Sequence, residues 1–103
     1  MTIEILYFDG CPNHAPTEEL VRDVIGALSV DAEIRLERVE TPEAAEKARF
    51  IGSPTVRIDG VDIDPVARDA SRFGLTCRRY GTVGVPPREL IEAAIHNASG
   101  AAQ

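Results

Sequence analysis

Two sulfur atoms and one imidazole are the groups in this chain with the most evident chemistry. The cysteines are Cys11 and Cys77, and His14 follows the first of them by three residues. A thiolate attacks disulfides and binds soft metals, whereas a thiol is poor at both. An imidazole near a sulfur atom can take up and return the thiol proton near neutral pH. The spacing therefore predicts thiol chemistry at Cys11, assisted by His14.

The segments around Cys11 favour its thiolate form. An apolar run over about residues 2–8 predicts a buried strand, and helical spacing of apolar residues predicts a helix that ends near Leu28. Cys11 falls between the two, where free backbone N–H groups and the helix dipole stabilise negative charge. Pro12 suits the first helical turn because it has no N–H group to leave unsatisfied. The competing interpretation is an inert cysteine beside a surface histidine.

Cys77 lies in a segment, residues 66–85, that fits neither a helical nor a strand period. Such long irregular segments are often functional, and the adjacent Arg78 and Arg79 favour a thiolate. If the segment folds back over the helix start, Cys77 could be a remote resolving thiol for Cys11. Both sulfurs could instead bind a soft metal such as Hg(II). A buried cysteine that only anchors the segment is equally compatible with the sequence.

The remaining periodicities predict the elements that position these groups. Residues 32–40 alternate in polarity as a strand with one exposed face does, which suits a sheet edge or an exposed position. The other predicted elements are a helix from Thr41-Pro42 to about Arg49, a hairpin of Thr55–Asp59 and Val61–Asp64 around Asp59-Gly60, and a helix from Pro86-Pro87 to about Ala98. The fold class is α/β in the order βαβαββα, with helices flanking a four-stranded mixed sheet whose first two strands are parallel.

Length and charge limit the classes of function. A chain of 103 residues with uniform composition predicts one domain over residues 1–98 and a flexible tail over 99–103. Seventeen acidic against eleven basic residues give a net charge of −6, which argues against nucleic acid or an anionic membrane as partner. No apolar run approaches the ~20 residues of a membrane span, and Met1 leads directly into a predicted strand. We therefore expect a cytoplasmic protein without a cofactor.

Residues 3–64 resemble the thioredoxin-like superfamily. The resemblance rests on a strand followed by Cys11-Pro12-Asn13-His14 at a helix start, and on Gly52-Ser53-Pro54-Thr55-Val56 before the hairpin. It implies that Cys11 is the nucleophile, that the Ser53–Pro54 bond is cis, and that Pro12, Ser53, Pro54 and Thr55 contact the substrate. His14 stands where the family's second cysteine usually stands, so a general dithiol reductase is not expected. The size of the chain is closer to that of glutaredoxin than to that of thioredoxin.

A second resemblance is to small bacterial thioredoxin-family proteins, some of which are labelled alkylmercury-lyase-like or occur among mercury-resistance functions. It rests on residues 7–14, on residues 52–56 and on residues 73–80. It implies Hg(II) or an organomercurial as partner, with Cys11 and Cys77 as the metal ligands. Cleavage of a carbon–mercury bond would also need an acid, for which Asp9 is the nearest candidate in the sequence.

Three hypotheses follow. The first is thiol-disulfide exchange with a protein or small-molecule thiol or disulfide, with Cys11 as nucleophile, His14 as proton carrier and Cys77 as possible resolving thiol. The second is soft-metal or organomercurial binding through the two cysteines. The third is a non-catalytic interaction module whose thiols are incidental.

Overall fold

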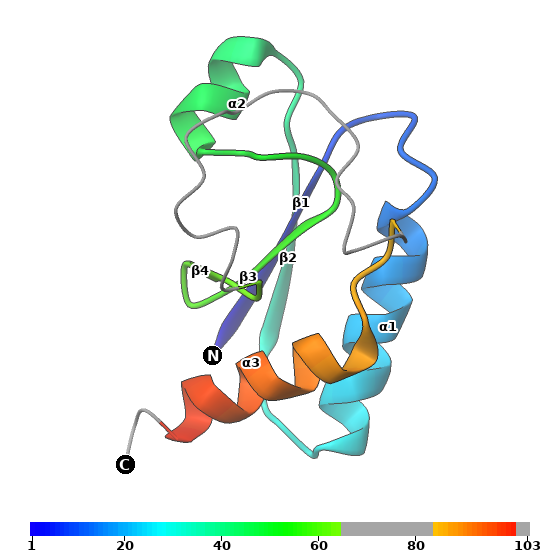
Figure 1. The fold of residues 1–103 in the computed structure, drawn as a ribbon, viewed down its shortest axis with the longest axis vertical. Coiled ribbons are helices and arrows are strands. Elements are labelled where there is room, and N and C mark those ends of the chain that lie inside the picture. Colours follow the sequence, from blue (N-terminus) through cyan, green and yellow to red (C-terminus); the bar gives the residue numbers. More distant parts are fainter. Residues whose placement is uncertain (65–83, 101–103) are drawn as a thin grey trace.

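The computed structural model describes residues 1–64 and 84–100, and within them a four-stranded mixed sheet forms the centre (Figure 1). The strand order is β2-β1-β3-β4. The strands are β1 (Thr2–Tyr7), β2 (Glu33–Arg38), β3 (Thr55–Ile58) and β4 (Val61–Asp62). β1 pairs in parallel with β2 and antiparallel with β3, and β3 pairs antiparallel with β4. The predicted mixed sheet, its parallel first pair and the edge position of the second strand are confirmed.

Three helices complete the predicted order βαβαββα: α1 (His14–Ala27), α2 (Pro42–Ala48) and α3 (Arg88–Gly100). α3 continues past Ala98, where the sequence predicted its end. The irregular segment expected at residues 66–85 lies outside the described residues except for Gly84 and Val85, and Cys77 lies outside them as well. The same holds for residues 101–103 of the expected tail.

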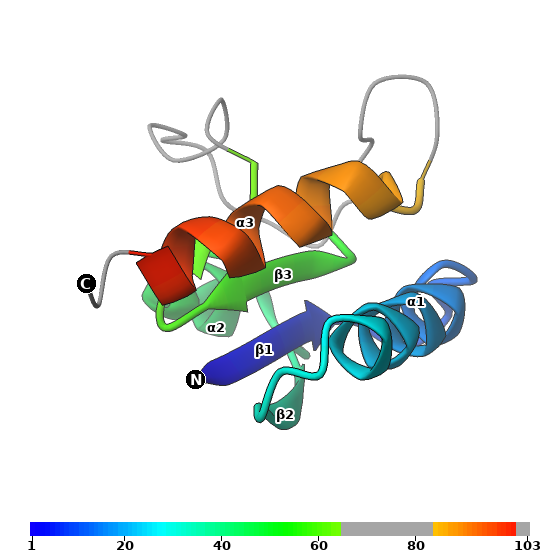
Figure 2. The same cartoon turned by 90° about the horizontal axis from the view of Figure 1, so that it is seen from below.

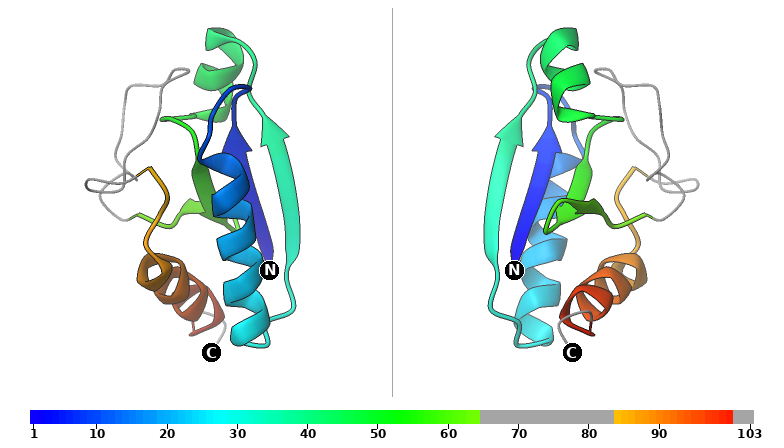
Figure 3. Two further views of the ribbon diagram at one scale, coloured as in Figure 1. Left: turned by 90° about the vertical axis from the view of Figure 1, so that its right-hand side faces the viewer. Right: turned by 90° about the vertical axis from the view of Figure 1, so that its left-hand side faces the viewer.

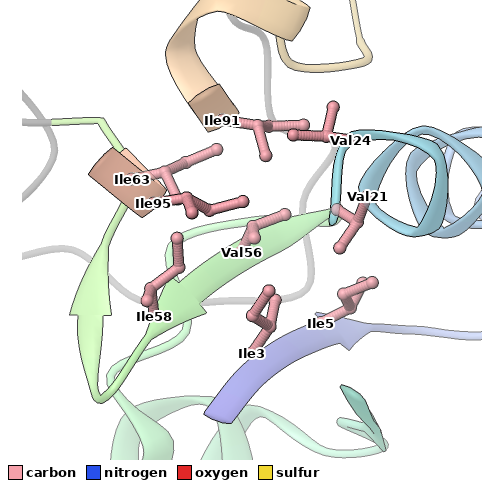
Figure 4. Packing of buried hydrophobic residues seen from close by; sticks show 9 residues of the cluster. All are labelled: Ile3, Ile5, Val21, Val24, Val56, Ile58, Ile63, Ile91 and Ile95. Atoms are coloured by element: carbon pink, nitrogen blue, oxygen red, sulfur yellow. The ribbon is translucent and has the colours of Figure 1, made fainter. Parts of the chain in front are cut away.

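One face of the sheet is covered by α1 and α3, which lie on the same side of β1 and β3 (Figures 2 and 3). Alternate residues of a strand point to opposite faces, so Ile3 and Ile5 both point toward these helices. Figure 4 shows the resulting cluster, in which side chains from both helices meet those of the two central strands. Its buried members are Ile3, Ile5, Val21, Val24, Val56, Ile58, Ile63, Ile91 and Ile95.

A smaller cluster covers the opposite face near the end of β1. Leu6 points away from α1 and packs with Val39, with Ala45 of α2 and with Phe50, all of which are buried. α2 begins as predicted, since the Thr41 side chain accepts a hydrogen bond of 3.0 Å from the backbone N–H of Ala44. On this second face β1 is therefore buried at Leu6, near its end, whereas Glu4 on the same face is only partly buried and interrupts the apolar sequence.

The sheet register brings two predicted site segments to the same end of the molecule. Leu6 of β1 lies opposite Thr55 of β3 in the antiparallel pair. The end of β1, which leads to Cys11, is thus beside the start of β3, which follows Pro54 (Figure 1). The local order of the chain could not place these segments together, because the pairing joins residues 49 positions apart.

Candidate thiol site at the end of the central strand

Cys11 lies between β1 and α1, as the sequence predicted. It follows the turn formed by Asp9 and Gly10, and its backbone N–H donates a hydrogen bond of 3.3 Å to the carbonyl oxygen of Phe8. Gly10 has φ +88°, a conformation that favours glycine. The Cys11 thiol is free, and only 4% of the residue is exposed. A sulfur in this position is shielded from large reagents but stands next to the positive end of a helix.

His14 is the first residue of α1 and contacts Cys11 through the backbone. Its Nδ1 atom lies 3.0 Å from the carbonyl oxygen of Cys11. The imidazole also stacks on the ring of Tyr7, with ring centroids 4.3 Å apart and an angle of 14° between the planes. The side chain of His14 is therefore held by both the end of β1 and the residue that carries the thiol.

The first turn of α1 is held by hydrogen bonds to the backbone carbonyl group of Asn13. The hydroxyl of Thr17, which is buried, donates a hydrogen bond of 2.7 Å to the Asn13 carbonyl oxygen, and the Thr17 backbone N–H donates one of 3.2 Å to the same oxygen. Within the described residues, the Asn13 side chain makes no capping hydrogen bond to the helix. It lies instead against Gly84, where a Cβ atom would meet its Nδ2 atom.

The segment before β3 is buried throughout. The Ser53–Pro54 peptide bond is cis, as predicted, and Gly52, Ser53, Pro54 and Thr55 are all buried. The Thr55 hydroxyl donates a hydrogen bond of 2.5 Å to the carbonyl oxygen of Gly52. The Ser53 hydroxyl has no hydrogen-bond partner among the described residues although it is fully buried. A fully buried hydroxyl without a partner is uncommon in folded proteins.

Asp9, the candidate acid, is held in an ion pair beside the site. Its carboxylate lies 3.1 Å from the guanidinium of Arg38, and Glu40 lies 2.5 Å from the same guanidinium. Asp9 and then Glu40 raise the pKa of Arg38 because both carboxylates stabilise its cation. All three side chains are largely exposed. Asp9 is thus engaged as an acceptor at the rim of the site, and its role as the acid stays a prediction.

The two-sulfur hypotheses depend on Cys77, which lies outside the described residues. Residues 1–64 and 84–100 contain no cluster of three or more His, Cys, Asp or Glu side chains that could hold a metal ion. The predicted meeting of Cys11 with Cys77, as resolving thiol or as metal ligands, stays a prediction. Pro12 is exposed beside Cys11, where a substrate could contact it.

Two residues of this site escaped the sequence predictions. The sequence predicts Tyr7 as part of the first strand and of the residues 7–14 that carry the second resemblance, but not as a contact of His14. The alternation that aims Ile3 and Ile5 at the helix face also aims Tyr7 at the start of α1. That alternation is the signal that could have identified it. Gly84 contacts Asn13 across seventy-one positions of sequence, and no local pattern indicates such a contact.

Comparisons of the chain with protein-family models, with curated proteins and with solved structures give no match. None of the helices within residues 1–64 and 84–100 has the length and apolar character needed to cross a bilayer. The assignment of a function therefore rests on the site itself.

Proposed function

We propose that this chain is a thioredoxin-like, thiol-based redox protein that carries out thiol-disulfide exchange through Cys11. The observation that carries the proposal is the free Cys11 thiol between the central strand and α1, with His14 bound to the same residue's carbonyl group. The sheet order β2-β1-β3-β4, with α1 and α3 on one face and α2 on the other, supports the resemblance that the sequence indicated.

The proposed reaction uses the thiolate of Cys11 as the nucleophile. Its Sγ atom forms a bond to one sulfur of the substrate disulfide, and the substrate S–S bond breaks with its electron pair on the other sulfur. The leaving sulfur then takes up the proton that His14, adjacent to Cys11, accepted from the thiol when the thiolate formed. A second thiol resolves the mixed disulfide, and Cys77 is the candidate within this chain.

The burial of Cys11 limits which disulfides can reach its sulfur atom. Because only 4% of Cys11 is exposed, a small disulfide or an extended segment reaches the sulfur more readily than a disulfide on a convex protein surface. The Ser53–Thr55 segment begins the strand next to β1 and would line the approach. A cytoplasmic site of action and the absence of a cofactor are parts of the same proposal.

The proposal predicts that a small disulfide modifies Cys11 first. We expect oxidised glutathione to form one mixed disulfide, on Cys11, which intact-protein and peptide mass spectrometry can detect and locate. We expect the Cys11→Ser variant to lose at least about 90% of the initial rate of this modification. In Cys77→Ser the adduct on Cys11 should accumulate, because its resolving thiol is removed. His14→Gln should slow formation of the mixed disulfide because the proton carrier is removed, and His96→Gln, on the exposed side of α3, is its matched control.

Two outcomes would contradict the proposal. One is a Cys11→Ser variant that folds, as judged by circular dichroism, and still reacts at the rate of the unmodified protein. The other is a Cys11 that reacts no faster in the folded chain than in the chain unfolded by urea. Titration with Hg(II) distinguishes the soft-metal hypothesis from thiol-disulfide exchange. If both sulfurs bind the metal, Cys77→Ser must weaken the binding of one equivalent of Hg(II).

A further inference from the structure

The contact between Tyr7 and His14 joins the end of the central strand to the start of α1. The rings are 4.3 Å apart and nearly parallel, so the flat faces of the phenol and the imidazole cover each other. The backbone of Tyr7 is fixed in the sheet, where its carbonyl oxygen accepts a hydrogen bond of 2.7 Å from Val39. Tyr7 therefore offers a rigid surface on which the imidazole rests.

The second contact of His14 defines which ring nitrogen carries hydrogen. Nδ1 lies 3.0 Å from the Cys11 carbonyl oxygen, and a carbonyl oxygen only accepts hydrogen bonds. Nδ1 must therefore be the donor, so the neutral imidazole has its hydrogen on Nδ1 and a free lone pair on Nε2. A rotation of the ring by half a turn would place Cδ2 where Nδ1 lies and Cε1 where Nε2 lies, and so would break the hydrogen bond.

We infer that Tyr7 is a positioning residue that, together with the Cys11 carbonyl, holds His14 in the Nδ1–H tautomer and leaves Nε2 as the proton-exchanging atom of the site. The tautomer follows from the geometry alone, and the role of Nε2 in exchange rests on the proposed function. In that reaction the unprotonated Nε2 first accepts the proton of the Cys11 thiol, which leaves the thiolate as nucleophile. The leaving sulfur keeps the electron pair of the broken S–S bond and then takes that proton from Nε2. The stacked ring limits rotation of the imidazole and so keeps Nε2 available.

The tautomer can be read directly by NMR. Long-range ¹H–¹⁵N correlation spectra of the labelled protein distinguish a protonated ring nitrogen from an unprotonated one. The chain has two histidines, so His14→Gln assigns the signals, and the exposed His96 is an internal reference. We expect neutral His14 to show a protonated Nδ1 and an unprotonated Nε2. An Nε2–H form of His14 in the wild-type spectrum would overturn the inference.

Substitution of Tyr7 tests the positioning role. In Tyr7→Leu we expect the two nitrogen signals of His14 to move toward the average of both tautomers, whereas Tyr7→Phe keeps a stacking ring and should keep the wild-type pattern. Exchange with a disulfide that releases a basic aliphatic thiol should slow by about tenfold in Tyr7→Leu. An aromatic disulfide should be affected far less, because its acidic thiol leaves without a proton.

The outcomes separate the inference from the proposed function. A folded Tyr7→Leu with the wild-type tautomer pattern, or with equal rate losses for both disulfides, would contradict the positioning role. Should Tyr7→Leu fail to fold, the wild-type spectrum still decides the tautomer, and Tyr7→His supplies a second ring variant for the stacking test. Unchanged exchange in Cys11→Ser would instead refute the proposed function and leave the tautomer assignment intact.

Discussion

At the scale of single residues, the site depends on two close contacts around the start of α1. One is the bond from His14 to the Cys11 carbonyl, supported by Tyr7. The other is the packing of the Asn13 side chain against the backbone of Gly84, just before α3. A Cβ atom at Gly84 would meet the amide group of Asn13, so that side chain would have to move to accommodate it. The contact also joins the segment ahead of α3 to the turn that carries the thiol.

This contact predicts an energetic coupling between Asn13 and Gly84. The methyl group of Gly84→Ala would overlap the amide of Asn13 and should destabilise the protein, whereas in an Asn13→Ala background the same substitution should cost little. Urea denaturation of the two single variants and the double variant gives the coupling free energy, which we expect to be about 0.5 kcal/mol or more. If the stability changes of the two single variants simply add in the double variant, the Asn13 side chain moves aside without a loss of free energy.

At the scale of elements, turns and caps fix where each helix and strand ends. α2 begins after the Thr41 cap. Arg49, the first residue after the helix, adopts a left-handed conformation with φ +55° that ends it. The hairpin closes on Asp59 and Gly60, with φ values of +51° and +86°, which is the two-residue turn that the sequence predicted. Asp59 also accepts a hydrogen bond of 2.8 Å from the backbone N–H of Thr2.

The hairpin turn gives a prediction at this scale. Gly60→Ala should destabilise the protein by about 1 kcal/mol, because a side chain at positive φ is strained although the space around it is open. Chemical denaturation measures the effect as a lower midpoint with an unchanged slope. Asp59→Asn is the matched control, since asparagine tolerates the left-handed conformation and keeps an oxygen for Thr2. A Gly60→Ala variant as stable as the wild type would mean that the turn adopts another conformation.

At the scale of the whole molecule, stability is concentrated on the central strands. Ile5 of β1 is fully buried between the sheet and the helices, whereas its register partner Leu36 on the edge strand β2 is 46% exposed. Both point toward the same face because paired residues of neighbouring strands share a side. Residues on the edge strand and on the central strand therefore differ in burial, although Leu36 and Ile5 have side chains of almost the same size.

The pair predicts unequal costs for matched truncations. Ile5→Ala should lower the free energy of unfolding by about 2–5 kcal/mol, because it removes buried surface and leaves a cavity. Leu36→Ala should cost less than about 1 kcal/mol, since much of its side chain already contacts solvent. Urea unfolding of the two variants under identical conditions makes the comparison. Equal losses would indicate that β2 is covered in solution, by a second copy or a partner.

Much of the fold could be predicted from local sequence. Apolar spacing, the Thr41-Pro42 helix start and the Asp59-Gly60 turn defined the order of elements, because each depends on residues within a few positions of one another. The placement of Cys11 between strand and helix followed from the same local patterns. The end of α3 was two residues too short in the prediction, since apolar periodicity fades at a helix terminus.

The sequence by itself determined the elements, the thiol at the helix start and the imidazole three residues later. The tertiary structure alone decided what holds that imidazole: Tyr7 stacks on it, and the turn brings the Cys11 carbonyl within 3.0 Å of Nδ1. It also decided that the segment before β3 lies beside the end of β1 and that Gly84 packs on Asn13. These relations arise from strand pairing and helix packing between distant positions, which local propensities do not encode.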